Sequence, residues 1–132
     1  MTSFQYPTVE RLLGIAERAM GERPLVRDMG LLHSSCHRPA SVFFGLEQYP
    51  TLPEKAAAFM HSVARFHPLV DGNKRLALLG AYAMIGANGA RFAINNRQAA
   101  DLTLAVAAGE LSEVSEIAKV IDQHIVYPEE HN

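Results

Sequence analysis

Apolar residues recur at helical spacing along most of the chain, and residues that cap or break helices divide this pattern into segments. In the first segment, from Thr8 to Gly21, the apolar side chains fall on one broad face, which is typical of an amphipathic helix. Ser, Thr and Asp cap helix starts, whereas Gly and Pro end helices. The pattern predicts helices at about residues 9–20, 29–38, 52–67, 73–87, 96–108 and 112–125.

Two segments depart from an ordinary amphipathic helix. Residues 41–49 place three apolar residues before Gly45 and a mixed stretch after it, which indicates a short hairpin or flap. Residues 76–87 contain no charged side chain, so we expect this helix to be the most buried one. The sequence therefore predicts an all-α fold: a compact helical bundle, one domain over residues 1–132, with a buried central helix and a small β-hairpin flap.

Composition narrows the class of protein. A chain of 132 residues that is 48% hydrophobic has the size and apolar content of one globular domain. The net charge of -2 and the lack of a basic run argue against direct nucleic-acid binding. Cys36 is the only cysteine, the first residues do not resemble a signal peptide, and the longest apolar stretch is shorter than the roughly 20 residues of a membrane span. We expect a cytoplasmic protein with no membrane partner.

One polar cluster lies where a helix ends and the uncharged helix begins, at residues 67–75. The first-turn amides and the dipole of a helix attract anions, and Gly72 allows a ligand close to the backbone. Lys74 and Arg75 add positive charge at the same place, and arginine can grip a phosphate with two N–H groups. These residues predict a phosphate-binding helix start.

Two further residues extend this chemistry. Asp71 would repel a phosphate unless a divalent cation lay between them, and Mg²⁺ is typically held by a carboxylate together with substrate phosphates. His67 is suited to accept a proton near neutral pH. Together they indicate transfer from a nucleotide to a hydroxyl. On these residues alone, a purely structural role of the cluster stays open as an alternative, since Asp, Gly and Asn also cap helices and form turns.

The segment His67-Pro68-Leu69-Val70-Asp71-Gly72-Asn73-Lys74-Arg75 resembles the signature of the Fic/Doc family. Lys74 stands where the Fic branch has a glycine, and Leu78 stands where that branch has a second arginine. Both differences match the Doc branch. Leu69 differs from the usual phenylalanine, which is thought to anchor the loop in the core, and leucine is expected to do this with less volume. The flap, the Ala-rich helix and residues 105–111 are also similar to the Doc branch.

The resemblance implies a role for each residue of the site. His67 would deprotonate the target hydroxyl, and Asp71 would hold Mg²⁺. The phosphates of ATP would be bound by four residues of the loop and helix start, with a weaker match shortly before the loop: Gly72, Asn73, Lys74, Arg75 and Arg65. The flap at residues 41–49 would position the target segment as an added strand.

The Doc-branch resemblance implies a toxin that moves the γ-phosphate of ATP to a Ser or Thr hydroxyl of a translation factor such as elongation factor Tu, and so blocks translation. An adenylyltransferase, as in the Fic branch, is one alternative. A catalytically idle protein-binding module is another, but His67, Asp71, Asn73 and Arg75 are all intact. The inhibitory Ser/Thr-x-x-x-Glu pattern of some Fic proteins has only a poor match at residues 112–116. A separate antitoxin of the Phd type, binding through a helical tail, is therefore expected.

The remaining candidate residues carry weaker signals. Cys36 is expected to be a small buried residue rather than a nucleophile. Residues Phe43, Phe44 and Tyr49 are equally compatible with a flap and with a core. Five further histidines lack the spacing of a metal site and are expected on the surface or in packing roles: His33, His37, His61, His124 and His131.

Overall fold

The computed structural model describes residues 3–128 and shows an all-α architecture. In the described part, the helices are α1 (Val9–Met20), α2 (Met29–His37), α3 (Leu52–Phe66), α4 (Asn73–Ala87), α5 (Asn96–Ala108) and α6 (Val114–Asp122). A 3-10 turn, η1 (Arg38–Ala40), follows α2. The described strands form two antiparallel pairs, β1 (Val42–Phe43) with β2 (Leu46–Glu47) and β3 (Arg91–Phe92) with β4 (Ile125–Val126). The predicted fold class is confirmed.

The helix starts follow the capping residues of the sequence. The hydroxyl of Thr8 accepts from the Arg11 amide at 3.1 Å, and the Asp28 carboxylate accepts from the Leu31 amide at 3.0 Å. Thr51 caps α3 in the same way. Each cap satisfies an amide that has no partner inside its own helix, which fixes where the helix begins.

The chain departs from the predicted elements at two places. The last helix ends at Asp122 rather than near residue 125, because Ile125 pairs with Phe92 in a second small sheet that was not predicted. Pro39 lies after the end of α2, at an early position of the 3-10 turn η1. An N–H at this position would have no partner within the turn, so the missing N–H of proline costs no hydrogen bond.

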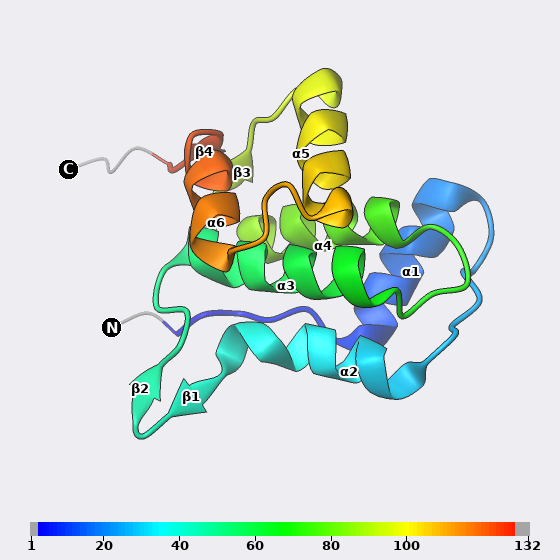
Figure 1. The fold of residues 1–132 in the computed structure, drawn as a ribbon, viewed down its shortest axis with the longest axis horizontal. Helices are drawn as coiled ribbons and strands as arrows, with labels where there is room; N and C mark the ends of the chain where they lie inside the picture. Colours follow the sequence, from blue (N-terminus) through cyan, green and yellow to red (C-terminus); the bar gives the residue numbers. More distant parts are fainter. Residues whose placement is uncertain (1–2, 129–132) are drawn as a thin grey trace.

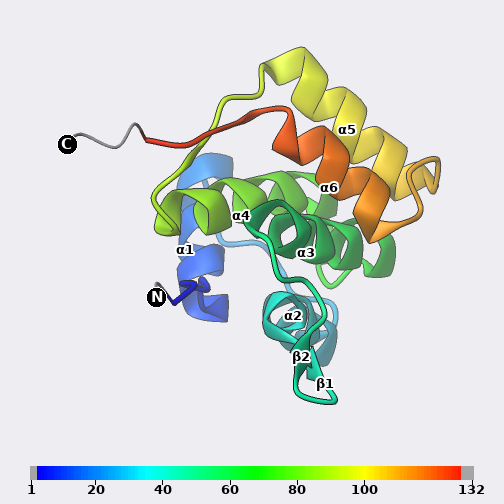
Figure 2. The ribbon, with the colours of Figure 1, turned by 90° about the vertical axis from the view of Figure 1, so that its left-hand side faces the viewer.

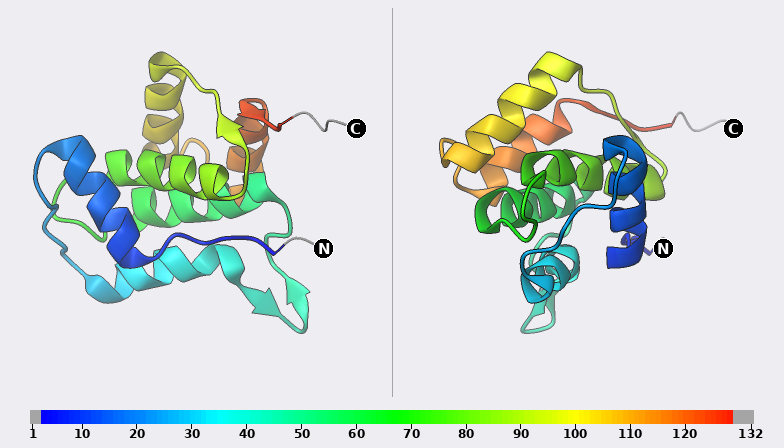
Figure 3. Two further views of the ribbon diagram at one scale, coloured as in Figure 1. Left: turned by 180° about the vertical axis from the view of Figure 1, so that it is seen from behind. Right: turned by 90° about the vertical axis from the view of Figure 1, so that its right-hand side faces the viewer.

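Helices α3 and α4 lie side by side at the centre of the molecule (Figure 1). Helices α5 and α6 cover one side of this pair, and α2 lies on the other side (Figure 2). Helix α1 packs across α4, as the view from behind shows (Figure 3). The apolar core is therefore built around the α3–α4 pair, which supports the loop between them.

The prediction that residues 76–87 form the most buried helix is wrong, because α3 is more deeply enclosed. Eleven residues of α3 are buried and six of α4, although both helices have 15 residues. Four helices pack against α3, whereas α4 turns Leu78 toward an open cavity and leaves Tyr82 36% exposed. An uncharged surface thus marks α4 as a member of the central pair without making it the innermost helix.

The predicted flap exists as the hairpin β1–β2. Its two-residue turn holds Phe44 and Gly45 at positive φ, 51° and 76°, which matches the twist of a tight hairpin. The side chain of Phe44 is 90% exposed and that of Phe43 is 58% exposed, so these residues belong to the flap and not to the core. The hairpin projects from the helical bundle (Figure 1).

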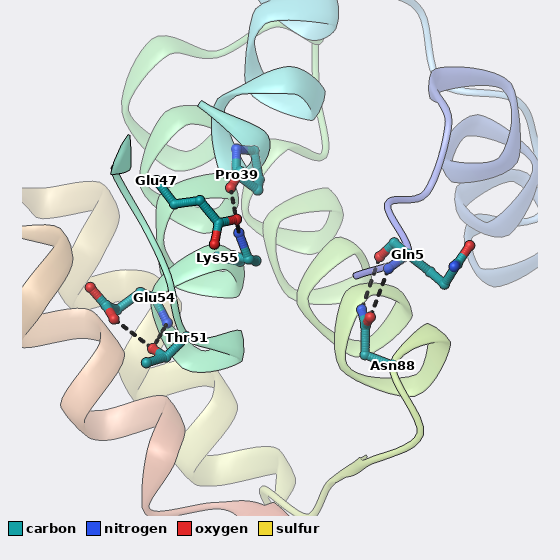
Figure 4. A network of polar contacts seen from close by, with 7 residues as sticks. All are labelled: Gln5, Pro39, Glu47, Thr51, Glu54, Lys55 and Asn88. Atoms are coloured by element: carbon teal, nitrogen blue, oxygen red, sulfur yellow. Dashed lines mark hydrogen bonds and ion pairs between the residues drawn. The ribbon is translucent and has the colours of Figure 1, made fainter. Parts of the chain in front are cut away.

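The base of the hairpin is fixed to the bundle by a buried cation (Figure 4). The Lys55 side chain is completely buried, and its Nζ donates to the Pro39 carbonyl at 3.2 Å and to Glu47 Oε1 at 3.0 Å. The same ammonium lies 4.6 Å from the ring centre of Phe4, an attractive cation–π geometry. Lys55 therefore joins α3, η1, β2 and the N-terminal segment at one point.

We expect Lys55→Met to destabilise the fold and loosen the hairpin. Methionine fills similar volume but leaves the Pro39 carbonyl without its donor, which costs roughly 1–3 kcal/mol. Glu47, whose side chain is 47% exposed, can be hydrated by solvent when the ammonium is removed, so it adds little to the loss of stability. Urea unfolding measures the change, and Glu47→Gln is the matched control with a smaller effect. A Lys55→Met variant as stable as the parent would contradict this account of the buried ammonium.

A second polar group holds the other side of the hairpin. Arg38 donates from Nε to the Tyr49 hydroxyl at 3.0 Å and from Nη1 to Ser62 and to His61 Nδ1, the latter at 2.8 Å. Burial and the nearby Arg38 guanidinium lower the pKa of His61, which favours the neutral ring as acceptor. His61 thus has a packing role, as expected.

The remaining sequence candidates fall outside any catalytic grouping. Cys36 is buried, as expected, and burial raises the pKa of its thiol to about 11, which disfavours the reactive thiolate. Among the residues that the structure describes, no three His, Cys, Asp or Glu side chains are grouped as a metal site. His131 lies outside the described residues. Within residues 3–128, no helix is long and apolar enough to cross a membrane.

Candidate active site

The predicted active loop joins the two central helices. Helix α3 ends at Phe66, and His67 follows in the left-handed region with a φ of 53°. The loop runs to Gly72, which has a φ of 89° and forms the N-cap of α4 without any side chain. A Cβ at Gly72 would meet only the flexible end of the Met20 side chain, at 3.0 Å, so the positive φ is the main reason that glycine is favoured there. The start of α4 lies at Asn73, as predicted.

Two side chains fix the inside of this loop. Leu69 is 1% exposed and anchors the loop in the core, as expected for the residue at this position. The side-chain amide of Asn73 accepts from the Leu69 N–H at 2.8 Å and donates to the Leu69 carbonyl at 3.0 Å. The side chain of Asn73 is therefore engaged in shaping the loop, rather than being free for a phosphate as the resemblance implied.

Residues 25–28, between α1 and α2, form a clamp segment that is hydrogen-bonded to the loop. The Pro68 carbonyl accepts from the amides of Arg27 and Asp28 at 2.8 and 3.0 Å, and the Val70 amide donates to the Leu25 carbonyl at 2.9 Å. A β-bridge between Val26 and Leu69 completes the pairing. Sequence reasoning missed this clamp, since no local pattern indicates a contact between segments 43 residues apart.

A cavity of about 1040 Å³ opens beside the loop. It is lined by six of the seven residues singled out in the sequence, which come from the loop and the first turn of α4: His67, Asp71, Gly72, Asn73, Lys74 and Arg75. Arg65 is not among the lining residues, because its guanidinium donates to the Ala107 carbonyl at 2.9 Å and packs against Gly109. The structure thus brings these six residues together and directs Arg65 to the end of α5.

The floor of the cavity attracts anions. The first intrahelical bond of α4 runs from the Leu76 amide to the Gly72 carbonyl at 2.9 Å, so the amides of residues 73–75 precede it and have no partner in the helix. Gly72 offers no capping side chain for these amides, and the residues that carry them, Asn73, Lys74 and Arg75, all line the cavity. Such a helix start binds phosphate through its amides and its dipole.

One additional cation was not predicted. Arg23, from the segment after α1, also lines the cavity. Its Nη2 lies 3.2 Å from Glu10, with side chains 46% and 81% exposed. An exposed pair of this kind contributes only about 0–1 kcal/mol, so a phosphate can compete for the guanidinium at little cost.

Asp71 fits the role of a ligand to a substrate-bound Mg²⁺. Its Oδ1 accepts from the Gly72 amide at 2.9 Å, which holds the carboxylate at the rim of the cavity. A hard oxygen donor beside a phosphate-binding helix start suits Mg²⁺, which takes one or two protein carboxylates and completes its shell with phosphates and water.

Small residues of α5 form part of the cavity lining. These residues are Ala100, Thr103 and Ala107, and the Thr103 hydroxyl is already bonded to the Ala99 carbonyl at 3.0 Å. These three lining residues carry no charge, so this part of the cavity is less polar than the start of α4.

The flap lies away from this cavity. The hairpin is at the opposite end of α3 from the active loop (Figure 1), and none of residues 41–49 lines the cavity. Because α3 is one unbroken helix of 15 residues, roughly 22 Å of helix separates the two features. The hairpin therefore does not line the cavity, and the segment that lies beside the loop is residues 22–28. The expectation that the flap positions the target segment as an added strand stays a prediction.

This loop between two central helices, with a histidine at its start and an anion-binding helix at its end, is the arrangement that the sequence signature implied. A sequence profile of the Fic/DOC family matches residues 6–85, and the chain belongs to this family. The match thus includes α1, the clamp segment and the entire active loop.

Among the relatives of this chain is a protein named Toxin Doc from Mycolicibacterium smegmatis. The two are 42% identical over 89 residues, which is 67% of this chain and 68% of that protein. The family membership and this relative support a toxin-type transferase of the Fic/Doc family.

Proposed function

We propose that this protein transfers the γ-phosphate of ATP to a Ser or Thr hydroxyl of a target protein and thereby acts as a toxin. The observation that carries the proposal is the cavity in which His67, Asp71 and the cationic start of α4 meet. A proton acceptor, a carboxylate for Mg²⁺ and a phosphate-binding helix are the parts that phosphoryl transfer to a hydroxyl requires.

The residues of the cavity have separate roles in this reaction. His67 takes the proton of the target hydroxyl as the new bond forms between that oxygen and the γ-phosphorus. The bond from the γ-phosphorus to the oxygen bridging to the β-phosphate breaks, and ADP leaves. Lys74, Arg75 and the amides of the first turn of α4 offset the negative charge on the transferred group. Asp71 would hold Mg²⁺, and the ion would supply further neutralisation of the phosphate charge.

Two lining residues support γ-phosphate transfer over AMP transfer. Lys74 occupies the cavity mouth with a charged side chain, and Leu78 presents an apolar side chain one turn further along α4. Both disfavour the deep binding of α- and β-phosphates that the resemblance implies for the Fic branch. A nucleotide that enters in the reverse direction brings its γ-phosphate to His67, with no change in the catalytic groups.

We expect a phosphate adduct on the target when the protein is incubated with Mg²⁺ and ATP. The experiment uses a bacterial lysate with ATP labelled at either the α- or the γ-phosphate, followed by mass spectrometry of the labelled protein. Label from the γ-position alone supports the proposal. An AMP adduct would show that Lys74 and Leu78 do not set the direction of transfer, and no adduct with either label would favour a catalytically idle binding module.

The proposal includes two protein partners. The target is a translation factor, with elongation factor Tu as the precedent of the family, and its segment approaches His67 past residues 22–25 at the rim of the cavity. The second partner is an antitoxin of the Phd type, whose helical tail covers the cavity. Expression of this chain alone is expected to arrest growth, and co-expression of its antitoxin to relieve the arrest. Harmless expression of a protein with confirmed transfer activity would contradict the toxin assignment.

A further inference from the structure

His67 is held in an unusual backbone conformation by a side chain from the clamp segment. Only two non-glycine residues in the described part of the chain have a positive φ, Phe44 at the tip of the hairpin and His67 at the end of α3. A residue with a Cβ adopts the left-handed region only where surrounding contacts enforce it. The contacts around His67 therefore determine where its imidazole is placed.

Arg27 supplies the strongest of these contacts. Its Nε donates to the carbonyl of His67 at 2.7 Å, and its Nη2 donates to the carbonyl of Phe66 at 2.8 Å. These two carbonyls flank the α-carbon of His67, so one planar guanidinium fixes the peptide planes on both sides of it. A forked pair of N–H donors has the geometry to do this, whereas a lysine ammonium acts as a single point charge.

The backbone of Arg27 is itself fixed to the same loop. Its amide donates to the Pro68 carbonyl, one residue beyond His67. Three consecutive carbonyls, from Phe66 to Pro68, therefore accept hydrogen bonds from Arg27. The Arg27 side chain is not among the residues lining the cavity, which separates its role from substrate binding.

We infer that Arg27 is a positioning residue for the general base: its guanidinium holds the left-handed turn at His67 and so aims the imidazole at the target hydroxyl. This inference rests on the proposed function for its kinetic consequence, but the conformational part stands on the structure alone. Because a misplacement of about 1 Å in a catalytic group can lower a rate 10²-fold, loss of this contact affects turnover more than nucleotide binding.

The test compares Arg27→Met with Arg27→Lys and with Arg97→Met, a control in which an exposed arginine of α5 outside the cavity is changed. Arg27→Met is expected to lower kcat for phosphate transfer by about 10- to 100-fold, with KM for ATP changed by less than about threefold. Arg27→Lys should recover part of kcat, since one carbonyl regains a donor. Arg97→Met should match the parent in both constants. Circular dichroism confirms that each variant is folded.

A second measurement is independent of activity. The ¹³Cα and ¹³Cβ chemical shifts of His67 report its backbone conformation, and in Arg27→Met they are expected to move away from left-handed values while those of His33 on α2 stay unchanged. Unchanged His67 shifts, or an unchanged kcat in folded Arg27→Met, would overturn the inference. If the parent transfers no phosphate at all, the proposed function fails, yet the shift of His67 still decides whether Arg27 holds the turn.

Discussion

His67→Ala is expected to reduce phosphate transfer by about 10² to 10⁴-fold, the usual range for loss of a general base. His67 is an exposed residue at the mouth of the cavity, and its imidazole makes no hydrogen bond that supports the core in the described structure. The loss therefore reflects chemistry rather than folding. Steady-state rates with labelled ATP and the purified target measure it, and growth after induced expression gives a cellular readout.

A second substitution separates the imidazole from the backbone turn. Glycine adopts the left-handed conformation of residue 67 without strain, so His67→Gly preserves the loop and removes only the side chain. Its activity should be as low as that of His67→Ala, with equal or greater stability. His33→Ala, which removes an exposed histidine of α2, is the matched control and should retain full activity. Substantial activity in either folded His67 variant would refute the assignment of the base.

Gly80→Ala is expected to destabilise the protein by about 1–3 kcal/mol, the typical cost of adding a methyl group to a filled core. At Gly80 the backbone of α4 lies against a side chain of α3, since a Cβ there would overlap the ring of Phe59. Phe59 is 1% exposed and belongs to the most buried helix, so its ring cannot move aside without disturbing the core. Urea or thermal unfolding of the purified variant measures the loss.

The matching substitution Gly86→Ala, six residues later in α4, should stabilise the protein instead of destabilising it. A Cβ added at Gly86 would meet no other atom within 4 Å, and Gly86 lies on the exposed end of α4. Alanine there gains up to about 1 kcal/mol from helix propensity. If Gly80→Ala proved as stable as Gly86→Ala, the close approach of α3 and α4 would be incorrect, and with it the support for the active loop.

The local part of the fold was predictable from the sequence because its determinants are local. Thr8, Asp28 and Thr51 cap helices through their own side chains, and Gly21 and Gly109 end helices in the left-handed conformation. The active loop was predictable for the same reason, since a cluster of polar residues between two apolar helices can be recognised from the order of the residues alone. A family resemblance added the chemistry of each residue.

The features that the sequence did not predict depend on contacts between distant segments. Strand β3 pairs with β4 across more than 30 residues, and each strand has only two residues, which is too short for an alternating pattern. The clamp at residues 25–28 and the role of Arg27 have the same origin. The separation between the hairpin and the loop was not predicted, because the 15-residue helix α3 between them fixes a distance that the sequence order does not reveal.

The pairing of Val26 with Leu69 also has a consequence for when the candidate site can form during folding. This pairing closes a chain loop of 43 residues that contains α2, the hairpin and α3, and such a closure has an entropic cost that only the assembled core offsets. A nascent or partly unfolded chain already contains all the candidate site residues, but without this pairing and the contacts of Arg27 it is expected to lack the turn at His67. We therefore expect the site to form late in folding, and the proposed transfer activity to be lost if residues 25–28 separate from the loop while the individual helices persist.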